Sequence, residues 1–127
     1  MLRKEEVKQG DCFVNELAAM KSILAKFPDL TEIGFGGSSA DRDAMLLPQS
    51  LDDFRRARAW LRAKPRTTHV NSSAGTCYGL KHLAEPEIGY STNGTFIAAA
   101  LAEGFKIKRC GHDSLNAWIN ISSRVRR

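Results

Sequence analysis

The sequence predicts an α+β fold in which four helices pack against a small antiparallel sheet. Two patterns support this: apolar residues recur at helical spacing in four segments, and a strict alternation near the C-terminus predicts a β-hairpin. The helices are expected near residues 11–27, 50–63, 77–85 and 94–103. With 127 residues, 43% hydrophobic and 26% charged, residues 1–127 have the size and composition of one globular domain. This composition excludes a disordered chain, a collagen-like repeat and a disulfide scaffold.

The first helix is predicted by an apolar stripe whose members are four and three residues apart. The stripe consists of Phe13, Leu17, Met20, Leu24 and Phe27. Asp11 can cap the start of this helix, and Pro28 ends it. Alternation over residues 30–35 then predicts a strand, and the Gly-, Ser- and Asp-rich residues 36–48 predict a loop.

The second helix begins at a sequence typical of a capping box, Ser50-Leu51-Asp52-Asp53, and ends at Lys64-Pro65. Its outer side carries four arginines, which Asp52 and Asp53 partly neutralise. The third helix should stop at Pro86. The fourth should be capped by Ser91, Thr92 or Asn93 and closed by Gly104.

The C-terminal hairpin follows from alternation over residues 105–108 and 117–121. One face should present Phe105, Ile107, Ala117, Ile119 and Ile121 to the core. The other should present Lys106, Lys108, Trp118 and Asn120 to solvent. Because an isolated two-stranded ribbon is marginal in water, we expect the strand at 30–35 to join it.

The net charge of +5 lies in the second half of the chain. Residues 1–63 carry ten Lys or Arg and ten Asp or Glu, and form a neutral scaffold of helices and a strand. Residues 64–127 carry nine basic and four acidic residues. This asymmetry indicates a polyanionic partner, most often nucleic acid, although ordinary solubilising charge would look the same.

Residues 77–121 resemble the small winged helix-turn-helix DNA-binding proteins of plasmids, phages and other mobile elements. The resemblance rests on the segments Cys77–Glu85 and Asn93–Leu101 and on the hairpin after them. It implies a non-enzymatic, winged-helix-like regulator or accessory protein that binds duplex DNA, sometimes as a homodimer. Residues 94–103 would read the major groove and residues 105–121 would form the wing.

The nucleic-acid-binding residues expected from this resemblance and from the charge pattern are Ser91, Thr92, Asn93, Thr95, Lys106, Lys108, Arg109, Trp118, Arg124, Arg126 and Arg127. An equally available interpretation makes the Ala-rich helix 94–103 the buried centre of the domain. The outer side of a reading helix normally carries base-matching side chains, and here it carries mainly alanine.

The alternative function is a protein-binding inhibitor or adaptor, such as an anti-defence protein, that docks an acidic partner on the same surface. No catalytic site, cofactor or metal is expected. A zinc site built from Cys77, His82, Cys110 and His112 would need ligand spacings that the sequence does not offer. The charged start of the chain and the lack of a long apolar run predict a cytoplasmic protein without a membrane span.

Overall fold

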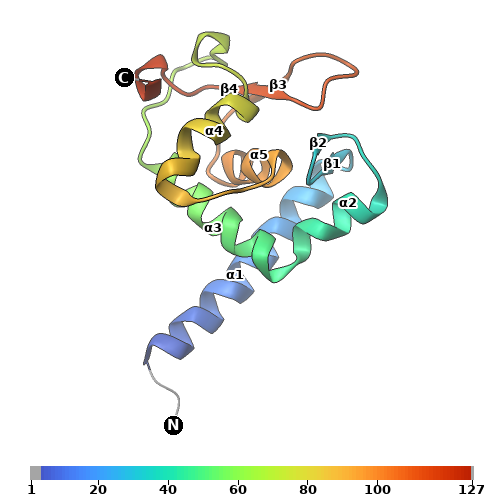
Figure 1. Ribbon diagram of the computed structural model, residues 1–127, viewed down its shortest axis with the longest axis vertical. Helices are drawn as coiled ribbons and strands as arrows, with labels where there is room; N and C mark the ends of the chain where they lie inside the picture. The colour runs from blue at the N-terminus through green and yellow to red at the C-terminus, as the bar shows by residue number, and fades with distance from the viewer. Residues whose placement is uncertain (1–3, 127) are drawn as a thin grey trace.

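The computed structural model describes residues 4–126, with side chains from residue 14 onward. The described chain forms five α-helices and two small antiparallel sheets, so the α+β class is confirmed (Figure 1). The helices are α1 (Lys4–Lys26), α2 (Ser39–Asp43), α3 (Pro48–Arg62), α4 (Cys77–Ile88) and α5 (Asn93–Ala102). The strands are β1 (Leu30–Thr31), β2 (Gly34–Phe35), β3 (Ile107–Arg109) and β4 (Ala117–Ile119). Short 3₁₀ turns η1 (Ala44–Leu46), η2 (Ser72–Ala74) and η3 (Ser123–Arg126) complete the order.

Helix α5 is the centre of the molecule. The helices α1, α3 and α4 and both hairpins surround it (Figure 1). Every residue from Thr95 to Ala100 is 0% exposed, so polar and apolar sides of the helix are buried alike. A mostly apolar helix that is buried on every side occupies a core position. The interpretation of residues 94–103 as a buried core helix is therefore confirmed, and a reading helix laid on the surface is not what these residues form.

The strand expected at residues 30–35 is instead a hairpin of its own. Among the described strands, β1 pairs only with β2, with Leu30 opposite Phe35, and does not join β3 and β4 in one sheet. The chain reverses between the two strands, and Gly34 supplies the positive φ of +124° there. A single backbone hydrogen bond, from Phe35 N to Leu115 O at 3.0 Å, links the two hairpins. The sheet predicted for a winged helix is therefore not confirmed.

The predicted loop 36–48 contains α2 and η1. A complete capping box starts α2: the Ser38 hydroxyl accepts from Asp41 N, and the Asp41 carboxylate accepts from Ser38 N. The capping box predicted at Ser50 is wrong, because α3 already begins at Pro48. The Ser50 hydroxyl lies within the helix and donates to Ala44 O at 2.7 Å. Pro48 starts the helix with its preset φ, so no side-chain cap is needed.

Two further helix boundaries differ from the prediction. Helix α1 begins at Lys4, so Asp11 lies inside it rather than at its cap. Helix α4 continues past Pro86 to Ile88 and ends at Gly89, whose φ is +82°. Pro86 is tolerated because it sits in the last turn, where its ring costs the helix a single backbone hydrogen bond. The end of α1 is held by Arg42, whose guanidinium donates to the carbonyls of Leu24, Phe27, Pro28 and Leu30.

The apolar stripe of α1 packs inside its own chain. Met20 and Leu24 are buried, and Leu17 and Phe27 pack against the same core; the Phe13 side chain lies outside the described residues. From Leu17 onward, the stripe is therefore not available to a second copy. The N-terminal part of α1 extends away from the other elements (Figure 1).

Candidate functional site

The hairpin places the predicted basic and aromatic residues on one face. Lys108 lies directly opposite Trp118 in the antiparallel register, and Ile107 lies opposite Ile119. Lys106 and Lys108 are exposed, and Trp118 is half-buried. The core-facing set of five is also confirmed, with Ile107 half-buried and the other four buried. The alternation in the sequence therefore predicted the core-facing side in full and the outer side except for Asn120, which is buried.

Asn120 has a structural role rather than a place at the surface. It is 5% exposed, and its Oδ1 accepts from Lys106 N at 2.7 Å while its Nδ2 donates to Thr67 O at 2.8 Å. Backbone bonds from Thr67 N to Asn120 O and from Asn71 N to Ile119 O continue this link. The segment 66–71 thereby runs along the free edge of β4. Lys106 also contacts the segment 66–71, because its Nζ donates to Thr68 O at 2.7 Å.

Arg109 does not belong to the lysine face. It alternates with Lys108, so it turns to the other side of the strand, where its guanidinium lies 4.8 Å from the Phe35 ring centroid. It also pairs with Asp29 at 3.5 Å. Its Nε is buried without a hydrogen-bond partner among the described residues. Arg109, expected among the nucleic-acid-binding residues, therefore lies on the side of the strand away from Lys106 and Lys108.

The residues at the start of α5 are mostly buried as well. Ser91, Asn93 and Thr95 are 1%, 9% and 0% exposed, which leaves them too little surface to touch a DNA groove. Thr92 caps the helix as one of the three predicted candidates, since its hydroxyl accepts from Thr95 N. These four residues therefore build the helix start and do not present a reading surface.

The basic tail lies beside the hairpin. Arg124 and Arg126 belong to η3, and both are exposed; Arg127 lies outside the described residues. Arg126 is fixed by a hydrogen bond from its Nε to Ala74 O at 2.6 Å. The hairpin and η3 occupy the upper edge of the molecule (Figure 1).

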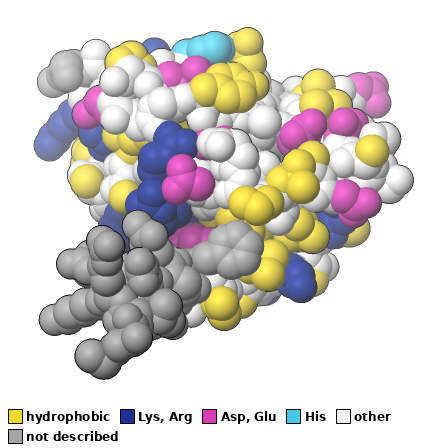
Figure 2. Space-filling model, turned by 60° about the horizontal axis from the view of Figure 1, so that its bottom comes forward, with side chains coloured by type: hydrophobic (Ala, Val, Ile, Leu, Met, Phe, Trp, Pro, Cys, Tyr) yellow, Lys and Arg dark blue, Asp and Glu magenta, His cyan; other side chains and the backbone are white. Residues whose placement is uncertain are grey.

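Elsewhere the arginines of α3 are paired with carboxylates. Arg55 and Arg56 pair with Asp52, and Arg56 also pairs with Asp53. Arg58 and Arg62 both pair with Glu103, at 2.8 and 2.7 Å, and Arg58 also pairs with Glu16 at 3.0 Å. These two carboxylates add to the partial neutralisation expected from Asp52 and Asp53. On the face in Figure 2, Lys and Arg side chains accordingly lie next to Asp and Glu side chains.

By contrast, the cations of the hairpin edge have no such partners. Within residues 14–126, no carboxylate forms an ion pair with Lys106, Lys108, Arg124 or Arg126. Part of the positive excess seen in the sequence therefore lies at this edge as charge without described carboxylate partners. Such a surface attracts polyanions.

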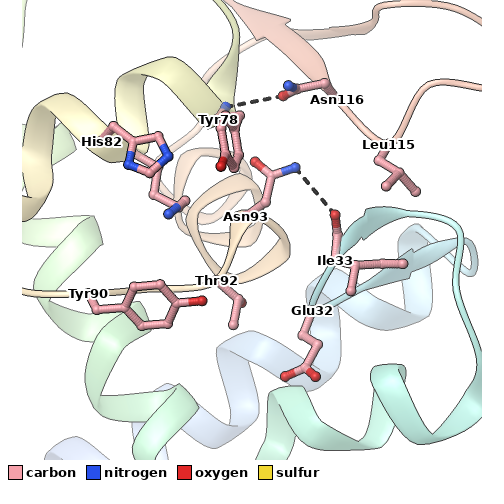
Figure 3. Close-up of a pocket in the computed structure, with 10 residues that line it drawn as sticks. Glu32, Ile33, Tyr78, His82, Tyr90, Thr92, Asn93, Leu115 and Asn116 are labelled. Carbon is pink, nitrogen blue, oxygen red and sulfur yellow. Dashed lines mark hydrogen bonds between the residues drawn. The ribbon is translucent and has the colours of Figure 1, made fainter.

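A cavity of about 440 Å³ lies at the other side of the hairpin, between α4, the start of α5 and the turn between β1 and β2 (Figure 3). It is lined by Glu32, Ile33, Tyr78, Lys81, His82, Tyr90, Thr92, Asn93, Leu115 and Asn116. Of these lining residues, only His82, Thr92 and Asn93 were candidates from the sequence, His82 for a zinc site that was rejected and the other two for the start of a helix. A usable signal was the spacing Tyr78, Lys81, Glu85, which places three side chains on one helical face.

The two described cysteines differ in chemical access. Burial raises the pKa of the Cys77 thiol to about 12, with a smaller contribution from nearby Cys110. Cys110 is half-buried, and burial raises its pKa as well, while a hydrogen bond with Ser114 opposes this. Thiolate is the reactive form of cysteine, so the raised pKa values make both thiols less reactive than a free cysteine.

We expect Cys77 to resist alkylation in the native protein. At pH 8, a maleimide should label Cys110 at least tenfold faster than Cys77, because Cys77 is fully buried as well as protonated. Peptide mass spectrometry after timed labelling measures both rates. In urea the difference should vanish, and equal native rates would contradict the buried position of Cys77.

No three His, Cys, Asp or Glu residues in the described part of the chain are grouped so as to hold a metal ion. Within residues 4–126, no helix combines the length and apolar composition needed to cross a membrane. Comparisons with protein-family models, curated proteins and solved structures gave no match for this chain.

Proposed function

We propose that the protein is a non-enzymatic nucleic-acid-binding protein that contacts the phosphate backbone of duplex DNA through the edge formed by β3, β4 and η3. The observation that carries the proposal is the set of four cations there, Lys106, Lys108, Arg124 and Arg126, without described carboxylate partners. Cations that neutralise phosphates release counterions, which supplies most of non-specific affinity.

The geometry favours backbone contact over base reading. The helix expected to enter the major groove is α5, and α5 is buried in the core. Its side chains are therefore not available to contact base edges. Lys106 and Lys108 are exposed on neighbouring positions of one strand face, at a spacing that suits successive phosphates. Trp118, half-buried opposite Lys108, gives the same face a flat apolar contact for a sugar or base edge. We therefore expect similar affinity for duplexes of different sequence.

The experiment is a salt titration of binding to a random-sequence duplex, followed by fluorescence anisotropy. Four phosphate contacts predict a slope of about −3.6 for log K against log salt concentration. The double variant Lys106→Ala/Lys108→Ala should bind more weakly and flatten the slope by about two. Lys21→Ala/Lys26→Ala removes the same charge from exposed positions of α1 and should leave the slope unchanged.

Absence of binding at low salt, or a slope that the hairpin variant does not alter, would contradict the proposal. The same cations would then favour docking of an acidic protein surface, the second function that the uncompensated charge supports.

A further inference from the structure

The cavity beneath the β3–β4 loop contains a lysine held between two aromatic rings. Lys81 is 3% exposed, and its Nζ donates to Glu85 at 2.7 Å. The same Nζ lies 5.2 Å from the ring centroid of Tyr78 and 4.9 Å from that of Tyr90. An ammonium group has three donors, and Glu85 takes one of them. Lys81 is therefore a fixed donor within an aromatic-lined space.

Both tyrosine rings keep exposed surface, although the Tyr78 ring also packs edge-on against His82, with 4.5 Å between the ring centroids. Tyr78 is 50% and Tyr90 is 66% exposed, which is unusual for large side chains that line a cavity. Ile33 and Leu115 add apolar surface on the opposite wall, and both are also exposed. Figure 3 shows the Tyr90 ring directed into the space beside Thr92. Two aromatic rings and an apolar wall suit a flat molecule that stacks.

Asn93 supplies an acceptor that nothing in the described chain satisfies. It is 9% exposed, and its Nδ2 donates to Ile33 O at 3.4 Å, whereas its Oδ1 is buried without a hydrogen-bond partner. Figure 3 shows the amide nitrogen turned to Ile33 and the oxygen turned away, toward Tyr78. A buried carbonyl oxygen without a hydrogen bond destabilises the free protein, and a ligand N–H would remove that cost.

The charges around the cavity disfavour an anion. Glu85 neutralises Lys81 and also lies 2.9 Å from His82 Nδ1, and the Glu32 carboxylate belongs to the lining. The backbone N–H groups at the α5 start are already used, since Gly94 N donates to Glu32 O and Thr95 N donates to Thr92 Oγ1. No free anion cradle remains here. The ligand should be neutral.

From these features, we infer that the cavity binds a neutral planar heterocycle with a lactam edge, in which a ring N–H stands next to a carbonyl. The ring stacks on the tyrosines, the N–H donates to Asn93 Oδ1, and the carbonyl accepts from Lys81 Nζ. Nucleobases such as hypoxanthine, guanine and uracil have this edge, either as free nucleosides or as unpaired bases in a strand. The site is separate from the cationic edge, so it does not rest on the proposed duplex binding.

Binding is tested by titrating the full chain with inosine while recording amide and Asn side-chain NMR shifts. Inosine should shift residues around the cavity in a saturable manner. The analogue 1-methylinosine keeps the carbonyl and loses the N–H, and it should bind at least tenfold more weakly because Asn93 Oδ1 stays unpaired. Adenosine, whose donor and acceptor are exchanged at this edge, should also bind at least tenfold more weakly.

Variants assign the site and separate the two sources of the base. Tyr90→Ala removes an exposed ring and should weaken inosine binding at least fivefold, whereas Tyr90→Phe and the distant exposed variant Leu47→Ala should not. A short single-stranded inosine oligonucleotide that binds tenfold better than inosine identifies an unpaired base in a strand, and equal affinity identifies a free nucleoside.

Equal affinity for inosine and 1-methylinosine would overturn the inference, as would saturable shifts that Tyr90→Ala leaves unchanged. Absence of saturation by either inosine or the oligonucleotide at millimolar concentration would overturn it as well. The lysine variants Lys106→Ala/Lys108→Ala should leave inosine affinity unchanged, so failure of this site and failure of duplex binding are distinguishable.

Discussion

Gly94→Ala is expected to destabilise the protein by at least about 4 kcal/mol, or to prevent folding. A Cβ at position 94 would overlap the carbonyl oxygen of Thr31 and lie 2.7 Å from its carbonyl carbon, both backbone atoms that cannot rotate away. The same approach is fixed by a hydrogen bond from Gly94 N to Glu32 O at 2.9 Å. Ordinary helix propensity would instead favour alanine by about 1 kcal/mol.

The measurement is the free energy of unfolding in urea, followed by circular dichroism. Gly111→Ala is the matched control, because a Cβ there meets nothing within 4 Å, and it should change stability by less than about 0.5 kcal/mol. A Gly94→Ala protein within about 1 kcal/mol of wild type would show that β1 does not pack on the start of α5 in this way.

Glu103→Gln is expected to cost about 3 kcal/mol at pH 7. The Glu103 side chain is 7% exposed and accepts from Arg62 and Arg58, and these bonds tie the end of α5 to α3. Removing the charge leaves Arg58, whose side chain is only 20% exposed, with Glu16 as its remaining partner. Asp52→Asn breaks ion pairs at an exposed site and should cost less than about 1 kcal/mol.

Protonation of the Glu103 carboxylate should account for part of the loss of folding stability at low pH. Hydrogen bonds from Arg62 and then Arg58 lower the pKa of Glu103 to about 2. Because the folded pKa lies below the ordinary value of 4.5, this stabilisation is complete above about pH 4.5 and is lost as the pH falls toward 2. The contribution is about 2–3 kcal/mol. Urea unfolding between pH 6 and pH 2 should therefore show a shallower pH dependence for Glu103→Gln, and equal slopes would contradict the pairing.

Local periodicity was enough to predict the elements that bury one face. The core-facing side of the hairpin was predicted correctly, because strand alternation depends only on neighbouring residues. Asn120 was assigned to solvent and is buried, because it bonds to the distant segment at Thr67. The existence of α1, α3, α4 and α5 was also predicted. Their starts were less predictable: α3 begins at Pro48 rather than at Ser50, and α1 begins before its apolar stripe.

The position of α5 and the contents of the cavity depend on contacts between distant segments. Thr95 is polar and yet 0% exposed, because Thr92 and the helix start satisfy its hydrogen bonds. The cavity joins Glu32, Tyr78 and Leu115 from three separate parts of the chain. The pairing of β1 with β2 depends on a turn over Glu32 and Ile33, which strand alternation alone does not reveal.

A chemical-shift map of the protein titrated with a fully paired, random-sequence DNA duplex at low salt tests the cationic edge most directly. Duplex contact through β3, β4 and η3 predicts saturable shifts at residues 106–108, at the Trp118 indole and at residues 123–126, which fade as salt is raised. Residues 91–95 should not shift, because four of them are buried and the half-buried Thr92 caps α5. Shifts centred on residues 91–95, or a duplex that leaves residues 106–108 and 123–126 unchanged, would contradict this assignment.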